Sequence, residues 1–96
     1  MAKGYWITFY RKIMNPDTLE AYAKLATPAI QAGGGKFIAR GKPVKVYDAG
    51  MNERAVVIEF ESVEKATATF ESPAYQEARK LLAGAVERDV RIIEGT

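Results

Sequence analysis

Arg-Ala-Val-Val-Ile-Glu-Phe, residues 54–60, is the stretch of sequence that decides the fold. Its β-branched and aromatic residues predict a strand. Val56, Ile58 and Phe60 lie on one face of that strand, and the opposite face is also apolar except for Glu59. An antiparallel strand with one face in water would alternate apolar and polar residues more cleanly. We therefore expect both faces of this strand to be covered.

A second strand with two largely apolar faces is expected at Gly4–Tyr10, which reads Gly-Tyr-Trp-Ile-Thr-Phe-Tyr. Its aromatic and β-branched residues favour a strand, and successive side chains of a strand point to opposite faces. This strand and residues 54–60 are predicted to form the centre of one sheet. The two faces carry Tyr5, Ile7 and Phe9 on one side and Trp6, Thr8 and Tyr10 on the other.

A long helix is expected after the first strand. Asn15 is a favourable N-cap, and Pro16 fits the first helical position. Gly33–Gly35 ends the helix, because glycine readily takes the left-handed conformation of a C-cap. Pro28 is expected to kink or break the helix, since proline removes a backbone hydrogen bond. The apolar face carries Leu19, Tyr22, Ala23, Ala26 and Ile30.

The remaining elements complete the pattern. Ser62 caps a second helix, and Ser72 with Pro73 restarts it as a short helix through Leu82. The second strand is expected at Lys36–Arg40, continuing past a bend at Gly41–Pro43 as Val44–Tyr47, and the last at Arg88–Glu94. The order strand, helix, strand, strand, helix, strand predicts a ferredoxin-like α+β fold. We expect one domain, residues 1–96, with an antiparallel sheet and its helices on one face.

A chain this short has helices for only one face of the sheet. The second apolar face is therefore predicted to pack against the same face of a second copy, which makes the protein a homodimer. The alternative is that the long segment 41–53 folds over this face. Val57 and Trp6 belong to the two central strands, and at least one of them is expected to face the partner.

The composition excludes several classes of protein. The 96 residues contain no cysteine and no histidine, so disulfides, thiolate sites, histidine-centred triads and proximal-histidine haem are excluded. We expect no metal and no cofactor, although a magnesium or calcium site made of carboxylates stays open. The net charge of +2 is too small to argue for nucleic acid. No uncharged stretch is long enough to span a membrane, and a cytoplasmic location is expected.

Three stretches together resemble a known family. Gly34–Gly41, Val57–Phe60 and Ser72–Gln76, with the opening Gly4–Ile7, are similar to domain-of-unknown-function family 1330 over nearly the whole chain. This resemblance implies the dimeric α+β barrel superfamily, in which two ferredoxin-like chains oppose their sheets. Relatives in that superfamily include cofactor-independent aromatic monooxygenases, lactone isomerases, dye-degrading peroxidases and small stress-related proteins. The haem-binding members use a histidine ligand, which this chain lacks.

Arg40 and Glu59 are the first candidates for chemistry. They belong to neighbouring predicted strands, and each sits at the end of an apolar run, where an isolated charge is costly. One hypothesis is a cross-strand ion pair that sets the register of the sheet. The other is a catalytic pair, in which Arg40 binds a carboxylate, phenolate or enolate and Glu59 orients it or moves a proton.

Aromatic residues are the second group of candidates. Trp6, Phe37 and Tyr75 are proposed to bind a planar ligand, and Tyr10 is proposed to donate a hydrogen bond or take part in catalysis. Core or interface packing is the alternative for each of them. The predicted function is that of a small oxygenase or isomerase acting on an aromatic or enolisable metabolite without a cofactor. The alternatives are a non-enzymatic ligand-binding or stress-related dimer, and a purely structural dimer.

Overall fold

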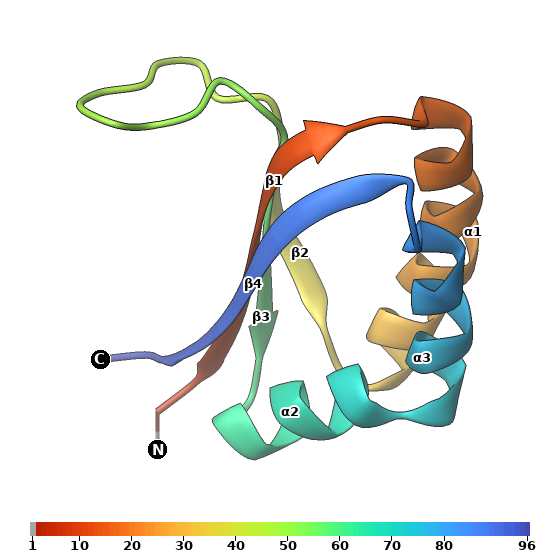
Figure 1. The fold of residues 1–96 in the computed structure, drawn as a ribbon. Coiled ribbons are helices and arrows are strands. Elements are labelled where there is room, and N and C mark those ends of the chain that lie inside the picture. Colours follow the sequence, from red (N-terminus) through yellow and green to blue (C-terminus); the bar gives the residue numbers. More distant parts are fainter. Residues whose placement is uncertain (1) are drawn as a thin grey trace.

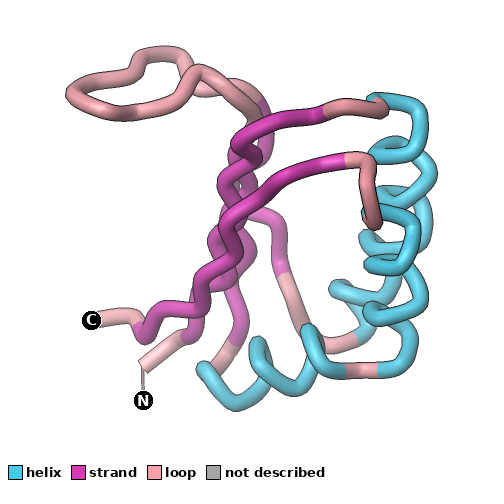
Figure 2. Tube along the Cα trace, viewed as in Figure 1, coloured by secondary structure: helices cyan, strands magenta, loops and turns pink. Residues whose placement is uncertain are grey.

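The computed structural model describes residues 2–96, which form a four-stranded antiparallel sheet with helices on one face (Figures 1 and 2). The strand order is β2-β3-β1-β4, in which each pair of neighbours is antiparallel. This is the ferredoxin-like arrangement that the order of elements predicted. The strands are β1 (Gly4–Ile13), β2 (Lys36–Gly41), β3 (Ala55–Phe60) and β4 (Val86–Glu94).

The helices begin where the sequence predicts. Side-chain oxygens of Asn15, Ser62 and Ser72 accept the first backbone N–H groups of three helices, at 3.1, 3.1 and 3.3 Å. These hydrogen bonds satisfy donors that a helix leaves free at its N-terminus, so all three predicted caps are confirmed. The helices are α1 (Pro16–Ala32), α2 (Val63–Glu71), α3 (Pro73–Arg79) and the short 3₁₀ turn η1 (Lys80–Leu82).

The first helix does not break at Pro28. It continues to Ala32, and Gly34 behind it takes a positive φ of 96°. Proline inside a helix costs about 3 kcal/mol or more, which burial of the apolar face on both sides of it offsets. Tyr22, Ala26 and Ile30 are all buried against the sheet. Tertiary packing therefore overrides the local signal for a break.

The predicted continuation of the second strand through Val44–Tyr47 is wrong. The ladder ends where Gly41 pairs with Ala55, and no strand of the described chain lies opposite the residues that follow. Residues 42–53, which we call the arm, project from one end of the sheet on the side away from the helices (Figure 1). Val44 is 99% exposed and Tyr47 is 74% exposed. The arm has no partner strand among residues 2–96, and so it stays irregular.

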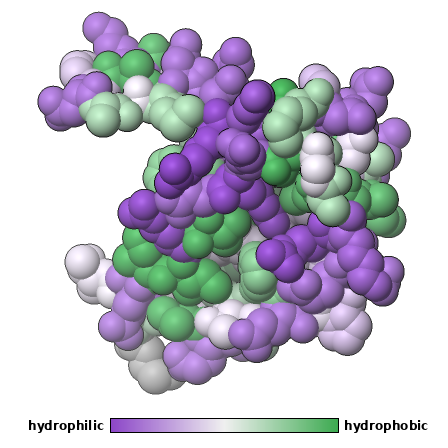
Figure 3. Space-filling model, viewed as in Figure 1, coloured by the Kyte–Doolittle hydropathy of each residue, from purple (hydrophilic) through white to green (hydrophobic). Residues whose placement is uncertain are grey.

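The face of the sheet that carries no helix, which we call the open face, is not covered by the arm. Phe9 and Ile93 on this face are 46% and 48% exposed, so the alternative in which segment 41–53 folds over it is wrong. Apolar side chains gather below the arm on this side of the molecule (Figure 3). Val57 lies on the open face, whereas Trp6 lies in the core.

Aromatic rings fill the core between the sheet and the helices. The ring of Trp6 stacks on Phe60 with centroids 6.2 Å apart, and it meets Tyr75 edge-on at 4.8 Å. Phe70 packs against both Trp6 and Tyr75, at 5.2 and 5.1 Å. Offset and edge-to-face pairs of this kind add stabilisation to that of the buried area.

Within residues 2–96, no helix is both long and apolar enough to cross a membrane.

Candidate functional site

The strand register separates two sets of side chains. On β1, Trp6 pairs with Ile58 and Ile92, and these positions face the helices. Tyr10 pairs with Arg88 on β4 and shares that side of the sheet. Tyr5, Ile7 and Phe9 and their partners face the other way, toward the open face. A site built on the helix side therefore draws on every second residue of a strand wherever the register has no shift.

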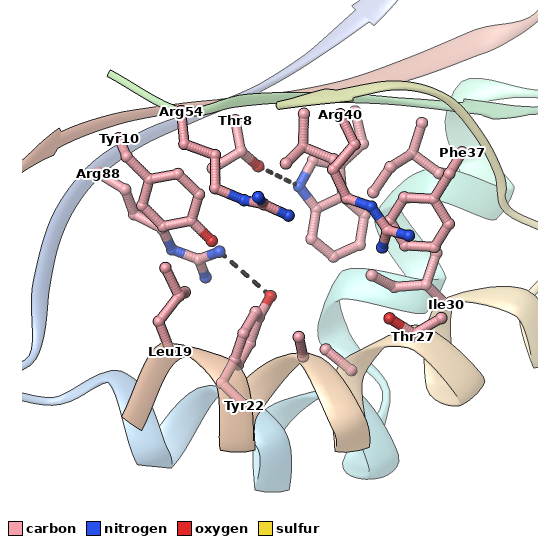
Figure 4. Close-up of a pocket in the computed structure, with 15 residues that line it drawn as sticks. Thr8, Tyr10, Leu19, Tyr22, Thr27, Ile30, Phe37, Arg40, Arg54 and Arg88 are labelled. Atoms are coloured by element: carbon pink, nitrogen blue, oxygen red, sulfur yellow. Dashed lines mark hydrogen bonds between the residues drawn. The ribbon is translucent and has the colours of Figure 1, made fainter. Parts of the chain in front are cut away.

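A cavity lies on the helix side, between the sheet and α1 (Figure 4). Its volume is about 50 Å³, which exceeds the space of roughly 10–15 Å³ that one water needs. Arg40 is an exposed residue and marks the open end. The walls combine aromatic and aliphatic side chains with a few polar groups, as small-molecule sites do. The polar and aromatic lining residues are Trp6, Thr8, Tyr10, Tyr22, Thr27, Phe37, Arg40, Arg54 and Arg88.

Three arginines from different parts of the sheet reach this cavity. Arg40 comes from β2, Arg54 immediately precedes β3, and Arg88 comes from β4 (Figure 4). The ion pairs among residues 2–96 all involve other cations, and no Asp or Glu lines the cavity. The three guanidinium groups thus concentrate positive charge that no carboxylate among the described residues balances.

A β-bulge turns Arg40 toward the cavity. The register pairs Lys36 with Glu59 and Phe37 with Ile58, then shifts, so that Arg40 pairs with Val56. Without the extra residue, Arg40 would share the open face with Lys36 and Glu59, because side chains alternate along a strand. The shift places Arg40 and Phe37 on the same side, with the guanidinium carbon 4.4 Å from the ring centroid. This cation–π contact orients Arg40 at the mouth of the cavity.

Arg88 lies at the inner end of the cavity within a cluster of phenols. Its Nη2 donates to the hydroxyl of Tyr75 at 2.7 Å, and its Nη1 donates to the hydroxyl of Tyr22 at 3.3 Å. The two hydroxyls are 2.7 Å apart and share a hydrogen bond. The Tyr22 ring also lies 5.5 Å from the guanidinium carbon of Arg88. These contacts hold the guanidinium in place without a carboxylate.

Burial keeps the phenol of Tyr22 in this cluster protonated. It raises the pKa of Tyr22 strongly, and the neighbouring Tyr75 raises it further. Burial also raises the pKa of Tyr10, although the charge of Arg88 acts in the opposite direction. Burial opposes the charge of Arg88 itself, but its contacts with Tyr22 and Tyr75 raise its pKa overall. Near neutral pH the cavity therefore presents phenol O–H groups and guanidinium N–H groups.

The structure brings most of the proposed site residues together. Arg40, Tyr10, Trp6 and Phe37 all line the cavity. Tyr75 is fully buried behind Tyr22 and touches the site through its hydroxyl. The same aromatic side chains thus pack in the core and lie in or beside the wall of the cavity.

Glu59 is the residue that the structure separates from the rest. It lies on the open face, where it accepts a hydrogen bond from the hydroxyl of Tyr5 at 3.2 Å and lies 3.8 Å from Lys3 Nζ. The expected cross-strand ion pair with Arg40 is wrong, because the register pairs Glu59 with Lys36. The catalytic pairing of Arg40 with Glu59 fails for the same reason, since the two side chains point to opposite faces of one sheet.

Sequence reasoning missed Arg54, Arg88 and Tyr22 as site residues. The alternation of side chains along a strand could have identified both arginines. Arg54 lies two residues before Val56 and Arg88 lies four residues before Ile92, so each points to the same side of the sheet as that apolar residue. Tyr22 was placed on the apolar face of α1 but not assigned a polar role. No group of three His, Cys, Asp or Glu side chains suited to a metal ion occurs within residues 2–96.

A family model described as a domain of unknown function, DUF1330, matches residues 3–96. No sequence in the curated set of proteins matches the chain.

Solved structures share the fold at low sequence identity. A protein of unknown function from Rhodopseudomonas palustris superposes with a TM-score of 0.73 at 18% identity, covering 99% of this chain and 83% of that one. A dimeric ferredoxin-like protein of unknown function from Thermobifida fusca gives 0.68 at 19%, covering 97% and 91%. A candidate antibiotic biosynthesis monooxygenase from Nitrosomonas europaea gives 0.57 at 18%, covering 97% and 89%.

Proposed function

The chain belongs to the DUF1330 family, a domain of unknown function, and we propose that it binds a small organic anion in the cavity between the sheet and α1. The observation that carries this proposal is the set of three arginines, Arg40, Arg54 and Arg88, which line the cavity without a carboxylate among the described residues. Guanidinium groups recognise carboxylates and enolates through charge-assisted hydrogen bonds. An anion supplies the negative charge that the cavity lacks.

The aromatic walls favour an organic anion over an inorganic one. Trp6 and Phe37 line the cavity beside aliphatic groups of Ile30, Val56 and Ile58. These surfaces offer apolar contact to a carbon skeleton, while the arginines take the acidic group. Arg40 stands at the exposed mouth and Arg88 at the inner end, so an anion is attracted along the whole length of the cavity.

Binding is the activity that this geometry supports best among those expected. An isomerase that moves a proton needs a base, and the described residues that line the cavity include neither a carboxylate nor a histidine. Tyr10 is a poor base, because burial raises its pKa. An oxygenase acting without a cofactor is the second candidate function. It is favoured by the same arginines, which would stabilise a substrate that enters as an enolate or phenolate.

The proposed functional unit is a homodimer formed through the open faces of two sheets. Apolar side chains there, including Phe9 at 46% and Ile93 at 48%, stay exposed in the described chain. A dimeric ferredoxin-like structure among those that share the fold supports the same assembly. We further propose that this dimer works in the cytoplasm, an environment compatible with a chain that contains no cysteine.

The test compares matched pairs of acids and amides. Benzoate and benzamide have the same shape, as do acetate and acetamide, but only the acids carry a negative charge. Isotope-labelled protein is titrated with each compound, and amide resonances around the cavity are followed by NMR. We expect each acid to bind at least about tenfold more tightly than its amide, since a hydrogen bond to a charged group is worth about 1.5–3 kcal/mol. Equal affinities of acid and amide would contradict the proposal.

A further inference from the structure

The phenol cluster at the inner end of the cavity has one proton more than its own hydrogen bonds use. The hydroxyls of Tyr22 and Tyr75 each accept a hydrogen bond from Arg88, and they share one proton between their oxygens. Two hydroxyls carry two protons, so the second proton must point to an acceptor outside the cluster. Tyr75 is completely buried, whereas Tyr22 lines the cavity. The arrangement that leaves no buried donor unmatched has Tyr75 donate to Tyr22 and Tyr22 donate into the cavity.

Thr8, on the opposite wall of the cavity, also has a hydroxyl proton that its own hydrogen bond does not use. Its Oγ1 accepts a hydrogen bond from the indole nitrogen of Trp6 at 3.0 Å, and Thr8 is 3% exposed. Among the side-chain hydrogen bonds of residues 2–96, Thr8 takes part only in this one, in which it is the acceptor. Since Thr8 also lines the cavity, that proton is available to a bound molecule. Together with Arg54, whose guanidinium points into the cavity, the wall is rich in donors (Figure 4).

The balance of donors over acceptors identifies the class of ligand. We infer that the ligand is a 2-oxo acid or the corresponding enolate, whose carboxylate meets the arginines and whose second oxygen accepts the proton of Tyr22. Such a molecule has acceptors only. A 2-hydroxy acid brings a proton that must find its own acceptor, and a 2-amino acid brings an ammonium group beside three guanidinium groups. This inference rests on the proposed binding of an organic anion.

The affinity order of three acids with one carbon skeleton tests the inference. Pyruvate, lactate and alanine differ only in the group at the second carbon, so differences between their affinities report on that group. We expect pyruvate to bind the wild-type protein about tenfold more tightly than lactate, and alanine to bind most weakly. Dissociation constants come from the same NMR titration, with acetate as the acid that lacks a second oxygen.

Two matched variants identify the donor. Tyr22→Phe removes the proton assigned to the ligand, so the preference for pyruvate over acetate is expected to disappear. Tyr75→Phe removes the neighbouring hydroxyl but leaves the proton of Tyr22 in place, so the preference is expected to remain. The NMR spectrum of each variant shows whether it is folded, and the affinity order of the wild-type protein tests the inference without either variant.

The outcomes separate this inference from the proposed function. Equal binding of pyruvate and lactate overturns the inference, while tight binding of benzoate over benzamide still upholds the anion site. Loss of the preference in Tyr75→Phe alone overturns the assignment of the donor to Tyr22. If no carboxylate binds more tightly than its amide, the proposed function falls, and the inference falls with it.

Discussion

The two faces of the sheet are built from the same strands but differ in the pairing of their charged side chains. On the open face, Asp89 lies between Arg11 at 3.3 Å and Arg91 at 2.8 Å, and Glu59 lies near Lys3 and accepts a hydrogen bond from Tyr5. On the helix side, the three arginines of the cavity have no carboxylate partner among the described residues. One face neutralises its acidic groups internally, and the other keeps its positive charge.

This difference indicates what each face is suited to meet. Paired charges are less costly to bury than isolated ones, so the open face is suited to pack against a second copy of itself. Unpaired guanidinium groups beside aromatic walls are suited to a ligand that brings a negative charge. The sequence of a single strand therefore serves two surfaces, because alternate residues point to opposite sides of the sheet.

The largest expected effect comes from a core residue of the helix side. Trp6→Ser removes a ring that contacts Phe60, Phe70 and Tyr75, and it is expected to lower the free energy of unfolding by about 3–5 kcal/mol. Tyr5→Ser changes the neighbouring residue on the open face, where the side chain is only half-buried, and should cost less. Urea unfolding measures the loss of stability in both variants. The signal is far-ultraviolet circular dichroism, which reports on the backbone and so does not need Trp6. Equal losses would show that the two faces do not differ in packing.

The next prediction addresses the open face. Val57→Asp places a carboxylate in the centre of the proposed interface, and the dissociation constant of the dimer is expected to rise by about 100-fold or more, since burying an unpaired charge is costly. Leu25→Asp is the control, because Leu25 is 53% exposed on the helix α1. Light scattering after gel filtration gives the mass of each variant. A Val57→Asp protein that stays dimeric would exclude this face as the interface.

A pair of arginine substitutions tests the contrast in charge directly. Arg54→Met is expected to weaken benzoate binding by about tenfold, because it removes a charge-assisted hydrogen bond, while the stability of the protein stays within about 0.5 kcal/mol of the wild type. Arg91→Met breaks the ion pair with Asp89 on the open face and should leave benzoate binding unchanged. The comparison fails if both substitutions weaken benzoate to the same degree.

The smallest effect is expected at high pH. The folded protein raises the pKa of Tyr22 above its ordinary value of 10.0 through burial and the contact with Tyr75. Above about pH 10 the unfolded chain releases this proton and the folded chain keeps it, so stability falls as the pH rises. Between about pH 9 and about pH 11, the free energy of unfolding is expected to fall less in the Tyr22→Phe variant than in the wild type. Urea midpoints at the two pH values measure this, and parallel declines would contradict it.

Local patterns predicted most of the fold. Asn15, Ser62 and Ser72 were recognisable as caps, because short polar side chains before a helix satisfy its free N–H groups. The β-branched and aromatic residues of 54–60 predicted a central strand, and the structure confirms it as β3. Such features depend on neighbours within a few residues of one another, and no distant part of the chain is needed to define them.

Less of the candidate site than of the fold could be predicted from the sequence. Arg40, Tyr10, Trp6 and Phe37 were proposed from residue type, and the structure places them around one cavity, yet Arg54 and Arg88 were missed. The pairing of Arg40 with Glu59 was wrong, because a single inserted residue between Phe37 and Ala39 reverses the direction of Arg40. Strand alternation is reliable only where the register has no shift.

The sequence by itself determined the order of the elements, the positions of the caps and the presence of two apolar faces on the central strands. Only the tertiary structure decided that the guanidinium groups of β2, β4 and the residue before β3 converge opposite Tyr22 of α1. The physical reason is the range of the interactions. Caps and alternation are set by adjacent residues, whereas the cavity depends on the register of strands that are far apart in the chain and on the bulge that turns one of their side chains.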